Sequence, residues 1–564
     1  MKVVDYNINL ENYTAGFSKC DFVEGGVDFR YFDKSAVINV NLKCKFEPYN
    51  YTRVFEREKS LVVTISINDV DKILVQCKES PFWAHPVFCN NTMEIPDKSQ
   101  YVLIETKNTH VFLMPITNEF YNTTIRGGKN DREIEICVNC VSPDVTEICG
   151  DVLIVTELKN PYDAVSEGFK TAWNMNILKT PPQSSKKYPK ILEQFGWCTW
   201  NAFYHDVSEI KIFEKMEEFK HKNIPVKWVL IDDGWMDVTD DMRLNSIYEN
   251  REKFPNGLKN TVDILKKKYG VAAVGVWYAA TGYWRGTGFK DENTFSASLD
   301  IELPKGYEFF NKWNSYLRAQ GIDFVKIDAQ GNLTEYLKGN HEALKIISDI
   351  HNGIDKSAKE QFEFIINCMG MDNINMFNRP SSVICRNSDD FFPNKKNILK
   401  KHILQNAYNS IFTEQMYFCD FDMWWSEHFE AKHNAVLRAI SGGPFYTSDM
   451  LGKSDDEIIK KFVNNDGTFN RYEKAAKPTV DCLFGFNNVL KLFNTKGENG
   501  VVAMFSFEDV GKTSISSYDF GGFGKFRVID IFSGDEYFLE DGQSLEIALG
   551  KHDVKMMKFV KILP

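Results

Sequence analysis

The order of apolar and polar positions divides the chain into three regions. In residues 1 to about 185, apolar and polar side chains alternate along runs such as Ala36–Leu42, Ser60–Ile67 and Tyr101–Thr106, with polar turns between them. A period of two residues is typical of strands that bury one face. We therefore expect an N-terminal β-sandwich over residues 1–185, which ends with a helix after Asn160 and a Pro-rich linker.

The middle region has a different pattern of apolar and polar residues. Eight short apolar runs end in polar or aromatic residues, and most are followed by segments with helical spacing. Strands that alternate with helices predict a (β/α)8 TIM barrel, here over residues 186–490. Strand-like alternation returns afterwards and predicts a small C-terminal β-sandwich over 491–564. The eight runs are Phe195–Trp200, Val226–Trp235, Val271–Trp277, Asp323–Asp328, Phe362–Cys368, Val383–Arg386, Met416–Asp420 and Gly443–Asp449.

Size and charge narrow the class of protein. A chain of 564 residues is too long for one hydrophobic core, and several domains are expected. The net charge of −11 argues against nucleic acid or an anionic membrane as partner, because both attract basic surfaces. The longest apolar-rich stretch, Gly270–Trp284, is too short to span a bilayer, and the first residues lack a signal-peptide core. We expect a cytoplasmic protein with reduced cysteines.

The chemistry of the barrel begins at the end of its fourth predicted strand. Asp328 follows Lys326 by two residues, so both side chains lie on the same face of the strand. A nearby cation keeps a carboxylate ionised, as a nucleophile requires. A buried structural ion pair is the alternative explanation of the same spacing.

A second carboxylate follows the sixth predicted strand. Asp390 stands four residues after Arg386, and Asp389 competes with it for a chemical role. Acidic residues at such a position also cap helices. Two carboxyl groups on different strand ends can flank a glycosidic bond, and retaining glycosidases place them about 5–5.5 Å apart.

The second predicted strand ends in adjacent carboxylates, Asp232 and Asp233. Such a pair binds sugar hydroxyls or a metal ion, but no spaced set of further ligands accompanies it, and we expect no metal. Cys137 and Cys140 lack a second pair of ligands at similar spacing and are interpreted as strand residues. No motif for a nucleotide or another cofactor is present, so no cofactor is expected.

Several tryptophans fall at or near the predicted strand ends. Together at one barrel rim they would form an aromatic wall suited to a sugar ring, although each by itself is explained equally well as core packing. The candidates are Trp197, Trp235, Trp277 and Trp284, with Trp200 beside them.

Several of these segments resemble a known family, both in their amino-acid sequences and in the order in which they follow one another. The group is that of raffinose synthases and seed imbibition proteins within glycoside hydrolase family 36, which includes alkaline α-galactosidases. The resemblance runs from about residue 100 to the end of the chain. The segments that carry it are Phe195–Tyr204, Val229–Trp235, Val325–Gln330, Arg386–Pro393 and Arg438–Asp449.

The resemblance implies retaining hydrolysis or transfer of α-linked galactosyl groups on a barrel with β-domains at both ends. It also implies a role for each matching residue. These are Asp328 as nucleophile, Asp390 as general acid/base, Lys326 and Arg386 as hydrogen-bond partners of the sugar, Asp232 and Asp233 at its 4- and 6-hydroxyls, Cys368 near its 2-position, and Asp420–Met423 as a supporting segment.

Two departures from the group affect what can be expected. Asn201 stands where the group usually has Asp, and the chain lacks the long insertions of the plant enzymes. We expect an exo-glycosidase that removes terminal α-galactosyl residues from a carbohydrate. The alternatives are an α-N-acetylgalactosaminidase with the same mechanism and a galactosyltransferase of raffinose-synthase type. A non-catalytic barrel is not favoured, because both carboxylates are present.

Overall fold

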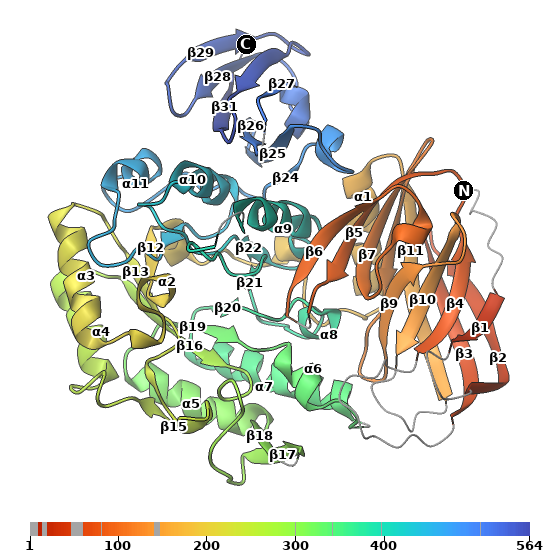
Figure 1. The fold of residues 1–564 in the computed structure, drawn as a ribbon, viewed down its shortest axis with the longest axis horizontal. Helices are drawn as coiled ribbons and strands as arrows, with labels where there is room; N and C mark the ends of the chain where they lie inside the picture. The colour runs from red at the N-terminus through yellow and green to blue at the C-terminus, as the bar shows by residue number, and fades with distance from the viewer. Residues whose placement is uncertain are drawn as a thin grey trace.

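The fold is described from a computed structural model of the chain. The structure describes residues 9–13, 20–46, 60–80, 82–139, 147–298, 300–340, 342–395, 398–507 and 509–563. Figure 1 shows three assemblies: an N-terminal antiparallel sheet, a central parallel sheet surrounded by helices, and a C-terminal β-domain against the helices of the central part. None of the described helices is long and apolar enough to cross a membrane.

The N-terminal region forms one eleven-stranded sheet in the order β1-β4-β10-β9-β7-β8-β11-β3-β2, and β5 pairs with β6 and β7. All of its ladders are antiparallel. The strands are β1 (Asn9–Tyr13), β2 (Cys20–Tyr31), β3 (Ser35–Phe46), β4 (Ser60–Ser66), β5 (Val70–Lys78), β6 (Ala84–Cys89), β7 (Ser99–Thr106), β8 (His110–Pro115), β9 (Asn122–Gly127), β10 (Glu133–Asn139) and β11 (Glu147–Leu158).

Strand β7 is buried on both of its faces over most of its length, and strand alternation decides which residue goes where. On β7, Val102 and Ile104 enter the internal core of the N-terminal region. Tyr101 and Leu103 point the other way, into the large core shared with α1 (Pro161–Asn174) and the barrel. The N-terminal region is therefore joined to the barrel by apolar packing.

The central sheet has eight strands, and all seven of its ladders are parallel. Its order is β22-β21-β20-β19-β16-β13-β12-β23, which places the first strand beside the eighth. This arrangement is consistent with a (β/α)8 barrel. The strands are β12 (Gly196–Cys198), β13 (Trp228–Ile231), β16 (Ala273–Ala279), β19 (Phe324–Asp328), β20 (Ile365–Asn367), β21 (Ile384–Arg386), β22 (Phe418–Asp420) and β23 (Tyr446–Thr447).

Helices surround this sheet and carry the chain from strand to strand (Figure 1). The longer ones are α3 (Glu209–His221), α4 (Leu258–Tyr269), α5 (Gly306–Ala319), α7 (Ala343–Gln361), α9 (Ile398–Thr413), α10 (Ala431–Ile440) and α11 (Asp456–Phe462). Shorter pieces lie in the connections: α2 (Trp200–Phe203), α6 (Asn332–Tyr336), α8 (Asn373–Met376) and the hairpins β14 (Met236–Val238) with β15 (Leu244–Glu249) and β17 (Thr294–Ser298) with β18 (Ile301–Pro304).

Strand β19 shows how the sequence fills the inside of this sheet. Val325 and Ile327 belong to the core shared with the helices. Phe324 belongs instead to the interior cluster, and Lys326 lies on the same face of the strand as Phe324. The Phe324 ring needs space on the next strand, because a Cβ on Gly275 would lie 2.3 Å from it. Aromatic residues thus close one end of the interior and leave polar side chains at the other.

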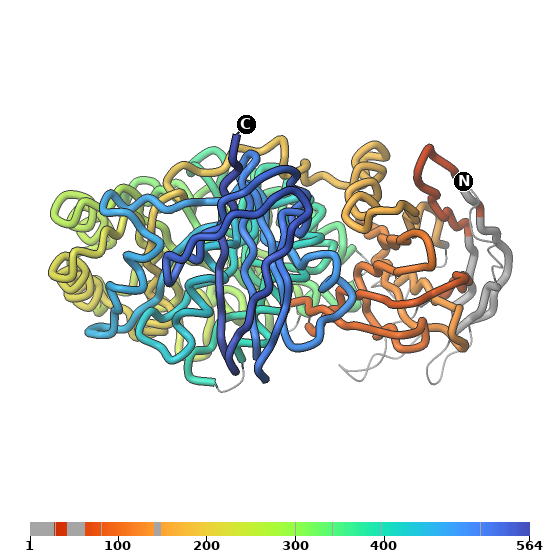
Figure 2. The backbone as a smooth tube through the Cα atoms, turned by 90° about the horizontal axis from the view of Figure 1, so that it is seen from above, coloured from red at the N-terminus to blue at the C-terminus, as the bar shows by residue number. Residues whose placement is uncertain are grey.

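The C-terminal β-domain contains a six-stranded sheet and a separate two-stranded pair. In Figure 2, which is the view from above, its strands lie in front of the central part. The first strand of the sheet lies before the predicted boundary at residue 490, and the domain limits themselves stay predictions. The strands are β24 (Lys477–Pro478), β25 (Val489–Lys496), β26 (Asn499–Ser506), β31 (Val554–Lys561), β28 (Phe526–Asp530) and β29 (Glu536–Leu539), with β27 (Gly511–Ile515) paired to β30 (Leu545–Leu549).

Candidate active site

Asp328 is the last residue of β19 and is held through both of its carboxyl oxygens. Trp277 on the neighbouring strand β16 donates its indole N–H to Oδ2 at 2.8 Å. The backbone N–H of Ala329 donates to Oδ1 at 2.7 Å. Ala329 has a φ of +54°, and such backbone conformations persist where the surrounding structure imposes them. The carboxylate is therefore fixed in place, as a nucleophile requires.

The surroundings of Asp328 adjust its pKa. Burial raises the pKa to about 6, the charge of Lys326 opposes the shift, and the charge of Asp390 adds to it. A group with this pKa is mostly ionised at neutral pH. Asp328 is then available as a carboxylate nucleophile, with only 6% of its surface exposed.

The ion pair of Lys326 crosses the sheet. Its Nζ lies 2.8 Å from Oδ2 of Asp232 at the end of β13, and both side chains are buried. The sequence correctly places Lys326 near Asp328, but the residue in direct contact with the ammonium group is Asp232. Breaking such a buried pair leaves one charge uncompensated, so the two residues depend on each other.

Asp233 is surrounded by three side chains. Trp284 donates its indole N–H to Oδ2 at 2.8 Å, and the Tyr283 hydroxyl donates to Oδ1 at 3.0 Å. His205 Nε2 lies 3.1 Å from Oδ2, and this hydrogen bond raises the pKa of His205. Asp233 also donates its backbone N–H to Asp232, at 2.9 Å. The two carboxylates thus form one rigid polar corner at the end of β13.

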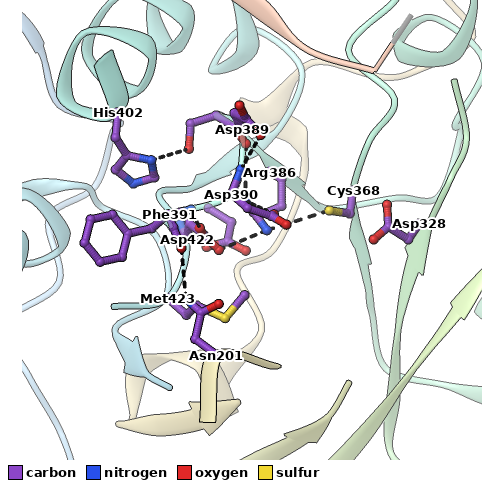
Figure 3. Close-up of polar contacts among 12 residues, drawn as sticks. Asn201, Asp328, Cys368, Arg386, Asp389, Asp390, Phe391, His402, Asp422 and Met423 are labelled. Atoms are coloured by element: carbon purple, nitrogen blue, oxygen red, sulfur yellow. Dashed lines mark hydrogen bonds and ion pairs between the residues drawn. The ribbon is translucent and has the colours of Figure 1, made fainter. Parts of the chain in front are cut away.

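Arg386 holds the second candidate carboxylate. Its Nη2 donates to Asp390 Oδ1 at 2.9 Å, and its Nη1 lies 2.9 Å from Asp422 Oδ1. The same Nη1 lies 3.7 Å from the Cys368 sulfur. Figure 3 shows Asp390 on the side of Arg386 that faces Cys368 and Asp328. The Asp390 side chain keeps 27% of its surface exposed, which lets it exchange a proton with water.

Asp389 is placed differently from Asp390. It accepts the backbone N–H of Asp390 at 2.8 Å, and the nearest cation is Lys401, 3.8 Å away. The sequence alone did not decide whether Asp389 or Asp390 is the second carboxylate of the site. The contact with Arg386 favours Asp390 as the residue that faces Asp328.

A tryptophan of the N-terminal region reaches this group. Trp83, just before β6, packs with Cys368 and Met371 in one apolar cluster. The Arg386 guanidinium lies 5.5 Å from the centre of the Trp83 ring. The Met371 backbone N–H also donates to the Phe82 carbonyl at 3.1 Å. The candidate site is therefore bounded on one side by the N-terminal region.

The four predicted tryptophans separate into two pairs. Trp277 and Trp284 bond to Asp328 and Asp233, as described above. Trp197 and Trp235 are fully buried, and their indole N–H groups donate to the backbone carbonyls of Asp449 and Trp277, at 3.3 Å and 2.8 Å. A side chain without exposed surface offers no face to a sugar ring, which excludes Trp197 and Trp235 from stacking on the substrate. Trp277 is only 1% exposed and contributes its hydrogen bond to Asp328 rather than a stacking face.

Some residues of the site were not predicted from the sequence. Tyr283 and His205 lie in connections after strand ends, and proximity to predicted site residues in the sequence was their only signal. Trp83 gave no signal, because it lies in a region predicted to be a separate sandwich. Among the described residues, no group of three or more His, Cys, Asp or Glu side chains could hold a metal ion.

Fold and site together define a class: an α/β protein whose eight-stranded parallel sheet is consistent with a barrel, with paired carboxylates at the carboxyl ends of the strands, where such barrels carry their active sites. The particular family follows from comparison with known proteins. The family model described as raffinose synthase or seed imbibition protein Sip1 matches residues 51–254 and 297–516. This is more than half of the chain, and the chain belongs to that family.

Curated relatives include plant galactosyltransferases. A probable galactinol–sucrose galactosyltransferase 6 from Arabidopsis thaliana is 29% identical over 491 residues, which cover 75% of this chain and 65% of the plant protein. A stachyose synthase from Pisum sativum is 24% identical over 579 residues, which cover 76% and 67%. The chain thus spans about two thirds of the length of the relatives that it matches.

Solved α-galactosidases share the fold. One from Lactobacillus brevis has a TM-score of 0.57 at 10% identity and covers 99% of this chain and 88% of its own. The family 36 α-galactosidase AgaA from Geobacillus stearothermophilus, solved with raffinose, has a TM-score of 0.54 at 10% identity and covers 99% and 90%. At this identity the likeness concerns the fold alone.

Proposed function

We propose that this protein is an enzyme that removes terminal α-linked galactosyl groups with retention of configuration. The observation that carries the proposal is the pairing of a fixed, buried Asp328 with a partly exposed Asp390 held by Arg386. The names of the plant relatives and the fold shared with α-galactosidases support galactosyl chemistry.

The proposed reaction has two steps. In the first, an Asp328 oxygen bonds to the anomeric carbon, the bond to the leaving oxygen breaks, and Asp390 transfers its proton to that oxygen. In the second, Asp390 takes a proton from water, whose oxygen bonds to the anomeric carbon while the bond to Asp328 breaks. Asp390 ends protonated, as it began, and the sugar is released in the α configuration. Two carboxyl groups suffice for this cycle.

Proton NMR of the first product tests the proposal. With nitrophenyl α-galactoside as substrate, we expect the α anomer of galactose to form first, before mutarotation mixes the anomers. Initial release of the β anomer, or no cleavage at all, would contradict the proposal.

Transfer to a sugar acceptor is the second candidate, favoured by those curated relatives that are named galactosyltransferases, while another curated relative is named an α-galactosidase. It uses the same intermediate, with an acceptor hydroxyl in place of water. A donor labelled in its galactosyl group, given with and without sucrose, separates the two reactions. Hydrolysis puts the label in free galactose in both samples, whereas transfer puts it in an oligosaccharide when sucrose is present.

The choice between galactose and N-acetylgalactosamine depends on the surroundings of Cys368, which the family resemblance places near the 2-position. The segment from Cys368 to Asp372 is covered by the N-terminal region, because Gln100 donates to the Met371 carbonyl at 2.9 Å and Lys78 pairs with Asp372 at 2.8 Å. Cys368 and Met371 are themselves buried, so an acetamido group at this place would have to displace the cover from the N-terminal region. We therefore propose galactose as the preferred sugar, and rates on the two nitrophenyl glycosides, measured side by side, check this.

A further inference from the structure

The residue that follows Asp390 is held at both of its backbone polar groups. The Phe391 N–H donates to Asp422 Oδ2 at 2.6 Å. The Phe391 carbonyl accepts from Asn201 Nδ2 at 2.9 Å. Both side chains are buried, with Asn201 2% and Asp422 0% exposed. Figure 3 shows Phe391 next to Asp422, with Asn201 nearby.

These contacts connect three strand ends of the barrel. Asn201 lies in α2, which follows β12, Asp422 follows β22, and Phe391 lies in the connection after β21. Asp422 also pairs with Arg386, whose other nitrogen holds the Asp390 side chain. Asp390 is therefore fixed through its own carboxyl group by Arg386 and through the next residue by Asn201 and Asp422.

The Phe391 side chain strengthens this anchor. The ring is fully buried, and its centre lies 5.5 Å from that of the His402 ring and 5.5 Å from the Arg438 guanidinium. The ring, the N–H group and the carbonyl group of Phe391 are all held in place. Because Asp390 directly precedes Phe391, the position of Phe391 also sets the position of the Asp390 backbone.

We propose that Asn201 is a positioning residue for the proton donor Asp390, acting through the Phe391 carbonyl. This inference rests on the proposed role of Asp390. A carbonyl oxygen requires a donor, and the Asn201 amide supplies one at every pH. An ionised aspartate at position 201 would place a carboxylate oxygen, which only accepts, against the Phe391 carbonyl oxygen, which also accepts. The contact is buried and lies close to the charge of Asp422. A protonated aspartate could donate again.

The test uses Asn201→Asp and Asn201→Leu, two replacements of similar size that remove the donor. For each, kcat/KM is measured across pH on raffinose, whose leaving group needs a proton, and on nitrophenyl α-galactoside, whose leaving group needs it far less. At pH 7 we expect both variants to lose roughly 10-fold to 100-fold on raffinose, a part of what general acid catalysis contributes, and only a few-fold on the nitrophenyl substrate.

The pH dependence separates positioning from general damage to the fold. Relative to wild type at the same pH, Asn201→Asp should recover on raffinose as the pH falls and the new carboxyl group gains a proton. Asn201→Leu should show no such recovery. Equal losses on both substrates, no loss at all, or Asn201→Asp and Asn201→Leu with the same pH dependence would each overturn the inference.

Asp390→Asn, measured in parallel, distinguishes failure of this inference from failure of the proposed function. If Asp390→Asn loses far more on raffinose than on the nitrophenyl substrate and the Asn201 variants do not, the role of Asn201 is wrong. If Asp390→Asn itself shows no dependence on the leaving group, the proposed function is what fails, and the inference fails with it.

Discussion

The two carboxylates of the site are supported in opposite ways. Asp328 is part of a strand, is 6% exposed, and has both oxygens bonded to groups on or next to the central sheet. Asp390 lies four residues beyond the end of β21, and its side chain is 27% exposed. Its position depends on Arg386 and on the anchored residue that follows it.

The difference matches the work that each group does in the proposed reaction. A nucleophile forms a bond at one fixed point, and a displacement of about 1 Å can cost about 100-fold in rate. A proton donor must change its protonation state in each half of the cycle and exchange protons with water. A buried strand end suits the first task, and an anchored but partly exposed connection suits the second.

The largest effect is expected at Asp328. Asp328→Ala should lower kcat on nitrophenyl α-galactoside on the order of 10⁴-fold or more, because no other group can form the glycosyl-enzyme. Asp323→Asn, at the start of the same strand segment and paired with Lys266, is the matched control and should stay within a few-fold of wild type. If Asp328→Ala keeps near-wild-type activity, Asp328 is not the nucleophile.

Asp390→Asn should follow with a loss of roughly 10²-fold to 10⁴-fold on raffinose, because the leaving oxygen no longer receives a proton. Azide should restore activity on the nitrophenyl substrate and give α-galactosyl azide, since azide attacks the glycosyl-enzyme without a base. In Asp328→Ala, azide would attack the substrate directly and give the β anomer. Asp389→Asn is the neighbouring control, and a loss there equal to that of Asp390→Asn would contradict our choice between the two.

How far sequence reasoning reaches can be seen at β19. Period-two alternation places Lys326 and Asp328 on one face, and the structure agrees, because Val325 and Ile327 pack against the helices instead. Seven of the eight predicted strand runs contain a strand of the parallel sheet, and the third run overlaps β16, which extends two residues further to Ala279. Patterns of this kind depend on neighbours within a few residues, which a sequence displays directly.

Contacts between distant segments are what the sequence did not reveal. Lys326 pairs with Asp232, 94 residues away, although spacing suggested its nearer neighbour Asp328. Trp83 reaches Arg386 from another region of the chain, and nothing in the alternation of its segment indicates this. Such contacts follow from how the strands and the N-terminal sheet meet in space.

The smallest predicted effect concerns the pKa of Asp328, which is about 6. Because the nucleophile acts as a carboxylate, the acid limb of kcat/KM should reach half of its limiting value near pH 6, rise above that pH and fall below it. The hydrogen bond from Trp277 lowers the pKa, so Trp277→Phe should move this acid limb to higher pH. The loss should be a few-fold near pH 6 and should shrink at pH 8.

Trp284→Phe is the matched control, because its indole bonds to Asp233 rather than to Asp328. It should weaken the binding of substrate and leave the acid limb where it is. An acid limb that stays in place in Trp277→Phe, or that moves equally in both variants, would show that some group other than Asp328 sets it. The hydrogen bond from Trp277 would then not be what keeps buried Asp328 ionised near neutral pH.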